Sequence, residues 1–468
     1  MKVDFYKEVL KRKDELIEKT VELLQINSEL TEFNPNSKTP FGEGIDEALN
    51  YMLNLAKKDG FKTLNADGYA GHIELGEGEE YIGIAGHLDV VPAGSGWDYP
   101  AYAAKIVDGK IYARGALDDK GPCMAAYYAM KIIKELKLPL KKRIKFILGT
   151  DEETGWRGIR YYFDKFPAQP SFGIIPDSDF PLTYAEKGIV NVKVSTKVDD
   201  KNGLIKFSSG LVANMVPDAA CAVLSDVSLK NKYLKYLKKH NYEGTAEVVN
   251  DKLHLSIIGK SAHGSLPEKG INAAYLLIEF FNEVDLNNDF IDLVNTYLLN
   301  DLEGKKIGVD HFDEETGSVT INAGVFKTVE DTFEIELNIR HPNGVSYDEF
   351  IKKIKKAFNS LAATVTVGKY QKALYVDPNS KEIQTLLNVY KKHTNDLDAK
   401  PLTTGGGTYA RAMANSVAFG PTFPGKPSYI HQKNEYIEIE DLLKMTAIYA
   451  ESLYEVAKWN NIWIYVDM

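Results

Sequence analysis

The chain has little cysteine and no long apolar run. Its only cysteines, Cys123 and Cys221, are far apart in sequence. A disulfide framework is therefore not expected, and a reducing compartment is favoured. The first 24 residues interleave charges with apolar residues such as Phe5 and Leu16, which is typical of an amphipathic surface helix and not of a signal peptide. No stretch approaches the ~18 consecutive apolar residues of a membrane helix, so we expect a cytoplasmic protein without a membrane partner.

The sequence also lacks an excess of positive charge. It has 56 Lys and Arg against 66 Asp and Glu, a net charge of −10, whereas nucleic-acid-binding proteins usually present a basic face. We therefore expect no nucleic-acid partner. No glycine-rich loop is followed by G-K-[ST], and no G-x-G-x-x-G follows the first strands, which argues against nucleotide binding. There is no repeat of fixed period and no low-complexity segment.

The chain does contain enough apolar material for more than one core. Hydrophobic residues make up 44% and charged residues 26% of it, as in globular proteins, and 468 residues are too many for one compact core. Residues 1–180 alternate strand and helix patterns, which favours an α/β fold with a mainly parallel sheet and helices on both faces. Strands are predicted at 81–87, 143–150 and 171–177, and helices at 118–137 and after Gly155.

The pattern changes near Leu182 and returns near Tyr375. Between these points the strands alternate apolar and polar residues, as half-solvated antiparallel strands do. They are predicted at 189–198, 253–263, 318–329 and 332–341, with helices at 272–284 and 347–358. The first pattern then returns as helices at 379–394 and 439–458 and a strand at 416–421. We predict a discontinuous α/β domain, residues 1–184 and 375–468, interrupted by an α+β domain, residues 185–374, which could have two sub-halves.

Four polar stretches follow or end predicted strands of the first domain and supply imidazole or carboxylate groups. They are GHLDVVPAG (86–94), ALDDKGP (116–122), TDEETGW (150–156) and IPDS (175–178). In open parallel sheets, ligands bind beyond the carboxyl ends of the strands. We therefore expect His87, Asp119, Glu153 and Asp177 to converge at one edge of the sheet.

Such a cluster suits the hydrolysis of an amide. Two divalent cations about 3.5–4 Å apart can lower the pKa of a water molecule and polarise a carbonyl. They need a bridging carboxylate, further nitrogen or oxygen ligands, and one carboxylate that moves the proton. Of Glu152 and Glu153, one could be a ligand and the other the base, and spacing does not say which. Asp89, two residues after His87, could accept the other N–H of that imidazole.

Taken singly, these residues also have ordinary structural explanations. Asp118 and Asp119 could cap a helix, Asp177 could belong to a turn, and His431, in PSYIHQKNEYI (427–437), could be a structural histidine. The acidic run 151–153 would be costly to bury without cations. The combination at one sheet edge favours the metal-site interpretation.

Together these motifs resemble the co-catalytic metallopeptidases that include aminoacylase, carboxypeptidase G, succinyl-diaminopimelate desuccinylase and the PepV-type dipeptidases. The matching patterns are H-x-D at 87–89, D-D-K-G at 118–121, D-E-E-x-G at 151–155 and H-x-x-N-E at 431–435. They occur in order through nearly the whole chain. The length, the DEETGW sequence and the long middle domain are most similar to the PepV-type enzymes.

The resemblance implies a role for each residue. Glu152 would be the general base, Asp89 would orient His87, and the peptide bond between Asp118 and Asp119 would be cis. Two divalent cations are implied; zinc suits the ligands, and manganese or cobalt would suit a carboxylate-rich site. The implied ligands are His87 and Asp177 for one cation, Glu153 and His431 for the other, and Asp119 as the bridge.

The resemblance also makes the middle domain a lid that binds substrate. His263, in S-A-H-G, and Asn214, in N-M-V-P, would stabilise an oxyanion, and Arg340 would hold a carboxylate. An exposed loop histidine and a surface arginine are the ordinary alternatives. The glycine-rich sequence TTGGGTYAR (403–411) adds the candidates Gly405, Gly406 and Arg411.

The sequence therefore predicts a two-metal-dependent enzyme that hydrolyses the peptide bond of dipeptides. A small peptide is the expected partner. The long lid resembles two lid halves in one chain, so we expect a monomer. Two alternatives remain at this stage: an N-acyl amino acid deacylase or desuccinylase that uses the same site, and a non-catalytic peptide-binding protein.

Overall fold

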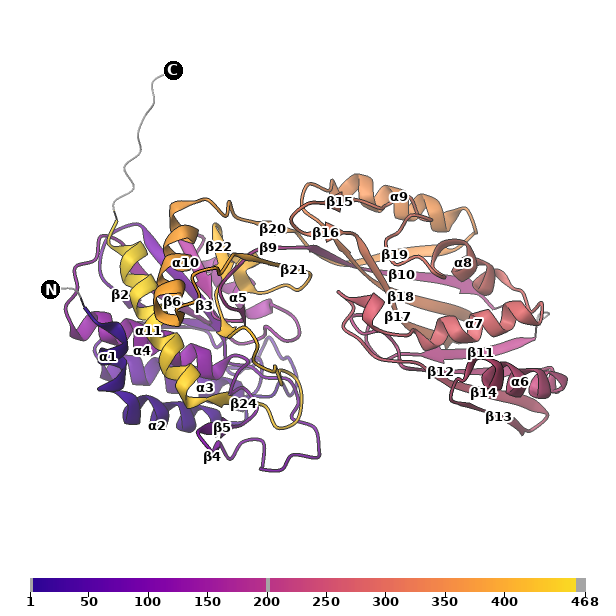
Figure 1. The fold of residues 1–468 in the computed structure, drawn as a ribbon, viewed down its shortest axis with the longest axis horizontal. Coiled ribbons are helices and arrows are strands. Elements are labelled where there is room, and N and C mark those ends of the chain that lie inside the picture. Colours follow the sequence, from indigo (N-terminus) through magenta and orange to yellow (C-terminus); the bar gives the residue numbers. More distant parts are fainter. Residues whose placement is uncertain (1–2, 199–202, 460–468) are drawn as a thin grey trace, which may run out of the picture. The chain divides into compact units, whose positions relative to one another are not determined.

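The computed structural model describes residues 3–198 and 203–459, and the chain forms two compact units. Among the described residues, unit 1 contains 3–184, 376–402 and 408–459, and unit 2 contains 185–198, 203–375 and 403–407 (Figure 1). The sequence placed residues 403–407 in the first domain. They group with unit 2 because their backbone and that of unit 2 are hydrogen-bonded: the N–H of Lys187 donates to the carbonyl of Thr404 at 3.1 Å.

Unit 1 is built on a mixed sheet whose centre is parallel. Strands β6, β3, β7 and β22 run parallel to one another, while β1, β2 and β9 pair antiparallel at the sides. The strand order is β1 (Lys62–Ala66), β2 (Ala70–Leu75), β6 (Arg143–Gly149), β3 (Tyr81–His87), β7 (Phe172–Ile175), β22 (Ser416–Ala418) and β9 (Thr183–Glu186). The short strands β20 (Leu374–Tyr375) and β21 (Leu402–Thr404), which pair with β9, lie where the chain passes from one unit to the other.

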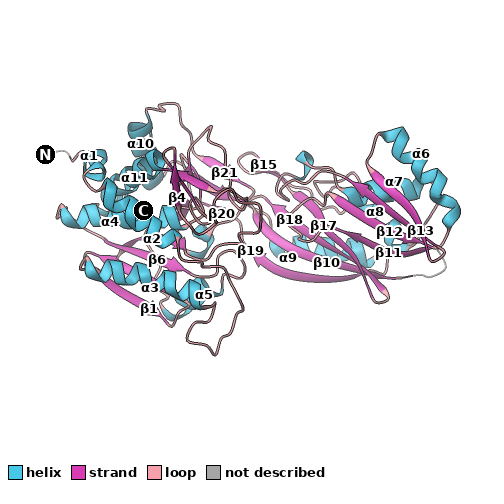
Figure 2. Cartoon of the chain, turned by 90° about the horizontal axis from the view of Figure 1, so that it is seen from below, coloured by secondary structure: helices cyan, strands magenta, loops and turns pink. Residues whose placement is uncertain are grey.

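Helices cover both faces of this sheet (Figures 1 and 2). Adjacent residues of a strand point to opposite faces, so the two faces can be told apart by their contacts. Gly86 of β3 faces Cys123 of α4, and His72 of β2 contacts Tyr162 of α5. The helices are α1 (Phe5–Leu10), α2 (Lys13–Leu24), α3 (Glu43–Lys58), α4 (Lys120–Glu135), α5 (Arg157–Lys165), α10 (Lys381–Thr394) and α11 (Ile439–Ala457).

Two small sheets complete unit 1. One joins β24 (Tyr436–Glu438), β5 (Lys110–Tyr112) and β4 (Lys105–Val107), and the other pairs β23 (Pro421–Thr422) with β8 (Ser178–Asp179). The first matters for the site, because the β24–β5 pairing brings a late segment of the chain beside a turn that precedes α4.

Unit 2 contains an antiparallel sheet with helices on one face (Figures 1 and 2). Its order is β13 (Gly244–Val249), β14 (Lys252–Ile258), β12 (Ala219–Leu224), β11 (Leu204–Ser209), β17 (Thr320–Val329), β18 (Thr332–His341), β10 (Gly188–Lys197) and β19 (Thr364–Gln371). A short hairpin joins β15 (Phe312–Asp313) and β16 (Gly317–Ser318). The helices are α6 (Lys230–His240), α7 (Ala273–Glu283), α8 (Asp289–Tyr297) and α9 (Tyr347–Asn359).

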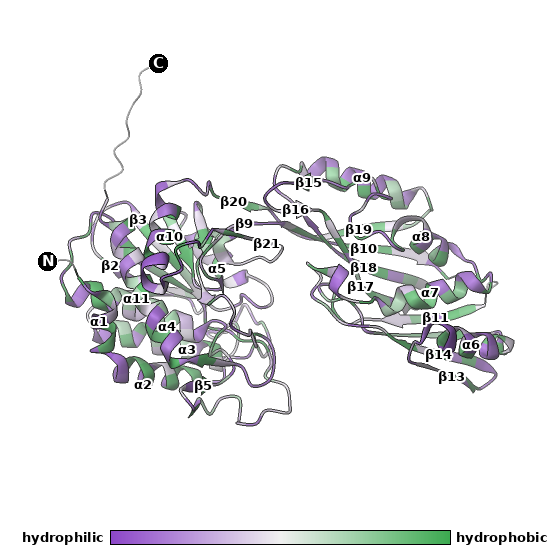
Figure 3. Cartoon of the chain, in the orientation of Figure 1, coloured by the Kyte–Doolittle hydropathy of each residue, from purple (hydrophilic) through white to green (hydrophobic). Residues whose placement is uncertain are grey.

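Alternation in the sequence explains the two layers of unit 2. In β10, buried residues such as Val190, Val192 and Val194 alternate with more exposed ones, so one face of the sheet packs under the helices. The helices are amphipathic and show purple and green stripes in Figure 3. The α/β fold with an antiparallel second domain is as predicted from the sequence.

The predicted single N-terminal helix is wrong, because the segment forms two helices, α1 and α2, with a break at Lys11 and Arg12. Phe5, Val9 and Leu16 are buried, so this segment is packed and not merely a surface helix. The predicted helix also covered residues 1–2, which lie outside the described part of the chain. Among the described residues, no helix is long and apolar enough to cross a membrane.

Candidate metal centre

The central parallel strands end at one edge of the sheet of unit 1. His87 is the last residue of β3 and is in register with Gly149, the last residue of β6. The acidic run 151–153 begins two residues after the end of β6, and Asp177 comes two residues after the end of β7. The sequence-based expectation of convergence at one edge therefore matches the strand pairing.

Asp118 lies between two imidazoles. Its Oδ1 is 3.0 Å from Nε2 of His87, and its Oδ2 is 3.0 Å from Nε2 of His431. His431 has a second carboxylate neighbour, because Oε1 of Glu153 lies 3.1 Å from its Nε2. On the other side, Oδ2 of Asp177 lies 3.9 Å from Nε2 of His87.

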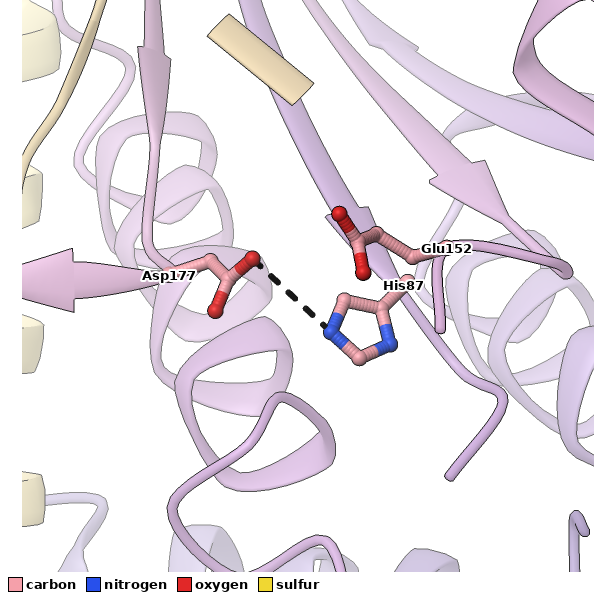
Figure 4. Close-up of side chains that lie close together, drawn as sticks. All are labelled: His87, Glu152 and Asp177. Carbon is pink, nitrogen blue, oxygen red and sulfur yellow. Dashed lines mark ion pairs between the residues drawn. The ribbon is translucent and has the colours of Figure 1, made fainter. Parts of the chain in front are cut away.

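The carboxylate of Glu152 joins the same cluster. Ligand atoms of His87, Glu152 and Asp177 all lie within 4.8 Å of one another, and so do those of His87, Asp118 and Glu153. Figure 4 shows the side chains of the first group pointing toward one another from separate segments of unit 1. Either group could surround one cation, but because both use the same imidazole of His87 they cannot each hold a cation at the same time.

The predicted bridge, Asp119, has a different environment. Its Oδ2 accepts hydrogen bonds from the backbone N–H of His87 at 3.1 Å and from the thiol of Cys123 at 3.3 Å. The Asp118–Asp119 peptide bond is cis, as the resemblance implied. The position between the two imidazoles therefore belongs to the first aspartate of the D-D-K-G motif and not to the second.

Asp89 connects the histidine to the acidic loop. Its two carboxylate oxygens accept the backbone N–H groups of Glu152 and Glu153, each at 3.1 Å. Nδ1 of His87 lies 2.9 Å from the backbone carbonyl of Asp89 and 3.6 Å from its carboxylate. Asp89 therefore positions both glutamates, and its backbone lies closer to the imidazole than its side chain does.

Burial and mutual repulsion set the electrostatics of the cluster. Burial raises the pKa of Asp119, Glu152 and Asp177 well above the ordinary value, and neighbouring carboxylates raise it further. Partial burial disfavours the charged form of His431, but hydrogen bonds to Asp118 and Glu153 outweigh this and raise its pKa to about 10. Without cations, the cluster can lower its charge only by holding protons.

Divalent cations fit this set of donors. Four carboxylates and two imidazoles from separate segments meet at one edge of the sheet, where His431 is the most exposed member. The negative charge of the four carboxylates exceeds the positive charge that the two histidines can supply. Imidazole nitrogen and carboxylate oxygen are the ligands that zinc accepts, and manganese and cobalt also take them.

The predicted lid residues form a cluster within unit 2. The backbone carbonyl of Asn214 accepts the N–H of Gly264 at 2.7 Å, next to His263. Nδ1 of His263 lies 2.6 Å from Oγ of Ser265. A Cβ on Gly405 would lie 2.8 Å from Cβ of Ser265, so the glycine-rich loop packs closely on the histidine loop.

Arg340 is attached to the same loop. Its guanidinium donates from Nη1 to the carbonyl of Gly405 and from Nε to Oδ1 of Asn338 at 2.9 Å. The N–H of Gly406 donates to Oγ1 of Thr404 at 3.0 Å. The candidate Arg411 belongs to unit 1, in the 3₁₀ turn Tyr409–Ala412, and is therefore not part of the lid cluster.

Two buried charges near the centre, Arg114 and Glu435, were not singled out from the sequence. Their side chains form an ion pair at 2.6 Å. Glu435 ends the H-x-x-N-E pattern, which was recognised without a role for its last residue. A glutamate four residues after His431 was the available signal, but only the structure shows its partners.

Comparison with known proteins shows which family the chain resembles. Residues 83–455 match the model of Peptidase family M20/M25/M40. A Bacillus subtilis (strain 168) protein named "Putative dipeptidase YtjP" is 42% identical over 465 residues, covering 96% of this chain and 99% of that protein. A Staphylococcus epidermidis (strain ATCC 12228 / FDA PCI 1200) protein named "Putative dipeptidase" is 40% identical, covering 95% and 98%.

Solved structures show the same fold. Human carnosine dipeptidase 1 aligns with a TM-score of 0.60 at 16% identity, covering 97% of this chain and 98% of that one. The M20 family metallo-carboxypeptidase Sso-CP2 from Sulfolobus solfataricus aligns with a TM-score of 0.58 at 19% identity, covering 94% and 99%. The matched length, the sequence identity and the fold agree: the chain belongs to Peptidase family M20/M25/M40 and is a metallopeptidase.

Proposed function

We propose that the protein hydrolyses dipeptides with two divalent cations held at the cluster around Asp118. The observation that carries the proposal is the position of Asp118, with one carboxylate oxygen 3.0 Å from each imidazole. A shared carboxylate between two nitrogen ligands is what a pair of adjacent cations requires. Relatives that match over nearly their whole length and are named as dipeptidases support the choice of substrate.

In this proposal each side chain of the cluster has one task. Asp118 would be the ligand shared by the two cations, with His87 and Asp177 as the further ligands of one and His431 and Glu153 as those of the other. Bound divalent cations supply Lewis acidity, which lowers the pKa of a water molecule and neutralises charge on the scissile carbonyl. Zinc, manganese and cobalt are all compatible with these ligands.

Glu152 is the proposed general base. It takes a proton from the attacking water and passes it to the leaving amine, so that water and one peptide bond become a carboxylic acid and an amine. Its backbone is fixed by the hydrogen bond from its N–H to Asp89, which holds the carboxylate at the cluster where the attacking water would be bound.

We also propose that the lid cluster binds the substrate. His263 and Asn214 donate to the oxyanion, and Arg340 holds the carboxylate of the substrate. The hydrogen bonds from Arg340 to Asn338 and Gly405 fix the plane of the guanidinium group, as bidentate recognition of a carboxylate requires. Gly406 and Arg411 are further candidates for contact with this carboxylate.

The test of the mechanism is Glu152→Ala. Activity on dipeptides should fall by several orders of magnitude, while the protein still binds two cations, as measured by elemental analysis after gel filtration. Full activity in this variant would contradict the role of Glu152. Gel filtration with light scattering on the same sample tests the expected monomer.

The choice between dipeptidase and deacylase needs a substrate comparison. Dipeptides with a free amine, the same dipeptides with an acetylated amine, and N-acetyl amino acids should be assayed with the same metal-loaded protein. The proposal predicts preference for the free amine. Preference for the N-acetyl amino acids would favour the deacylase, and inactivity of metal-loaded protein on the whole panel would favour a binding protein.

A further inference from the structure

The side chain of Glu435 is fully buried and accepts hydrogen bonds from one neighbouring turn. Its Oε1 accepts the backbone N–H of Leu117 at 2.8 Å and that of Asp118 at 3.1 Å. Its Oε2 accepts Nη1 of Arg114 at 2.6 Å. Glu435 is 0% and Arg114 is 2% exposed, so this is an ion pair closed off from solvent and built directly onto the segment that carries Asp118.

Backbone pairing holds the same two segments together. The carbonyl of Glu435 accepts the N–H of Ala113 at 3.1 Å. From there β24 pairs with β5, with Tyr436 opposite Tyr112. Glu435 therefore lies at the point where the strand that follows His431 joins the strand that precedes Asp118.

A second attachment lies one residue earlier. The side chains of Asn434 and Asp98 are joined by a hydrogen bond from Nδ2 to Oδ2 at 3.0 Å, and the backbone N–H of Asp98 donates to Oδ1 of Asn434 at 2.9 Å. The guanidinium of Arg114 lies over the ring of the neighbouring Trp97, 5.3 Å from Cζ to the ring centre. The segment 431–435 is thus fixed on two sides.

We propose that Glu435 is a positioning residue that sets the place of Asp118 relative to His431, with Asn434 as its outer support. The side chain of Glu435 accepts a hydrogen bond from the backbone N–H of Asp118, the proposed shared ligand. Glu435 also follows the proposed ligand His431 by four residues in the chain. The cation held by His431 and Glu153 therefore depends on Glu435 more than the cation held by His87 and Asp177. This proposal rests on the two-cation site proposed above.

The chemistry of the contact demands a carboxylate. Each oxygen of Glu435 accepts N–H donors, so glutamine, which has the same shape, must turn its amide NH₂ toward either Arg114 or the two backbone N–H groups. In either orientation the NH₂ group of the glutamine faces another N–H donor in a buried environment, and this unsatisfied pair lowers the stability of the contact. Glu435→Gln should shift the turn that carries Asp118 without removing any ligand.

The test is a titration of the metal-free full-length protein and its variants with Co²⁺, followed by calorimetry and by the visible absorption of the bound ion. The parent should bind two Co²⁺ ions. Glu435→Gln should bind both ions more weakly, because the shifted Asp118 is shared by both sites. The loss for the second ion, which also depends on the segment of His431, should be at least tenfold greater than the loss for the first, and its visible spectrum should change more.

Rescue separates positioning from a general loss of stability. The double variant Arg114→Gln/Glu435→Gln has an amide side chain at both positions. The NH₂ group at position 435 can then donate a hydrogen bond to the carbonyl oxygen of the side chain at position 114. The carbonyl oxygen at position 435 then again faces the backbone N–H groups of the turn. Affinity for the second Co²⁺ should recover to within threefold of the parent. No recovery in a folded double variant, with the second site still weak, would overturn the proposal.

Two further variants keep the test decisive if Glu435→Gln does not fold. Asn434→Asp keeps the shape and tolerates the left-handed backbone of this residue, φ 61°, but places a second carboxylate against Asp98; it should weaken the second Co²⁺ threefold to tenfold. The matched control is Glu451→Gln, which disrupts another buried carboxylate of unit 1, bound to Lys392 and His393.

The control should lower the melting temperature and leave both Co²⁺ affinities unchanged. If Asn434→Asp and Glu435→Gln behave like Glu451→Gln, or weaken both ions equally, Glu435 is only structural and the proposed function stands. If the parent itself fails to bind two Co²⁺ ions, the two-cation site is wrong and the positioning role is overturned with it.

Discussion

The backbone N–H of His87 donates a hydrogen bond to Oδ2 of Asp119, 3.1 Å away. The same oxygen accepts the thiol of Cys123, so the carboxylate of Asp119 is held between β3 and α4. Asp118, the preceding residue, has both its oxygens among the imidazoles. The two adjacent aspartates therefore differ in their contacts: Asp119 is hydrogen-bonded to the end of β3, and Asp118 lies between the imidazoles.

This difference predicts opposite outcomes for two isosteric substitutions. Asp118→Asn removes the shared anionic ligand, so the protein should lose tight binding of both cations and its activity should fall by roughly three orders of magnitude, as expected when the group that organises a two-metal site is lost. Asp119→Asn keeps an oxygen that can accept the N–H of His87 and leaves the ligands intact. It should keep two cations and lose stability instead.

Elemental analysis and thermal unfolding of the two variants check this prediction together. The expected result for Asp119→Asn is full metal content with a lower melting temperature. If this variant loses the cations while Asp118→Asn keeps them, then Asp119 is the bridge, and the assignment made from the side-chain contacts is wrong.

A second prediction concerns Asp89, whose two oxygens accept the N–H groups of Glu152 and Glu153. Asp89→Asn leaves one of these N–H groups facing an amide NH₂, so the loop that carries the proposed base and ligand should shift. Loss of such a supporting group typically costs about 10- to 100-fold in activity or metal affinity. Steady-state kinetics should show this fall mainly in kcat, and Asp67→Asn, at an exposed aspartate of the same unit, should have no effect.

The buried imidazole of His72 predicts a pH dependence of stability. Burial, followed by the charge of Lys145, lowers its pKa to about 4, whereas an unfolded histidine has a pKa of about 6.5. Between these values the unfolded chain binds the additional proton, so the free energy of unfolding must fall as the pH decreases. From pH 7.5 to pH 5 this single group should cost about 2 kcal/mol.

Urea unfolding at these two pH values measures the effect, provided that a variant isolates the histidine from the many carboxylates. His72→Asn removes the titrating group and can still bond to the hydroxyl of Tyr162, the partner of Nδ1 at 2.8 Å. The variant should lose less stability than the parent over the same pH range. His240→Asn, at an exposed position on α6, should behave as the parent does. Equal losses in all three proteins would show that folding does not lower the pKa of His72.

The fold was predictable where periodicity is strong. The apolar run that ends at His87 and the alternating pattern before His341 gave strands close to β3 and β18, because burial on two faces or on one face leaves different sequence patterns. The pairing at the sides of the first sheet was not predictable. Strands β1 and β2 are short and mix polar with apolar residues, and their place depends on register with β6.

The site was predictable as a cluster but not atom by atom. Spacing brought His87, the acidic run and Asp177 to one edge, since parallel strands end together. It could not distinguish Asp118 from Asp119, because adjacent residues share every feature of spacing and differ only in the direction of their side chains. Nor could it find Glu435, whose role depends on donors more than 300 residues earlier in the chain.

The last prediction concerns the glycine-rich loop of unit 2. A Cβ on Gly405 would lie 2.8 Å from Cβ of Ser265, which is too close, and Ser265 in turn contacts His263. Gly405→Ala should therefore displace the histidine loop or the loop that holds Arg340. We expect a higher KM and a lower kcat, by about tenfold in kcat/KM, with unchanged metal content, since a small misplacement of binding groups is enough for such a loss.

The neighbouring glycine provides the matched control. A Cβ on Gly406 would meet only Thr404 of its own loop, at 3.3 Å to Oγ1, and a shift of this order can be absorbed by a side-chain rotation. The substitution also keeps the backbone N–H of residue 406, the group through which it could contact the substrate carboxylate, so Gly406→Ala should retain most of the activity in the same kinetic assay. Because the two substitutions add the same methyl group one residue apart, equal losses would mean that chain flexibility, and not the contact with Ser265, is what the loop requires.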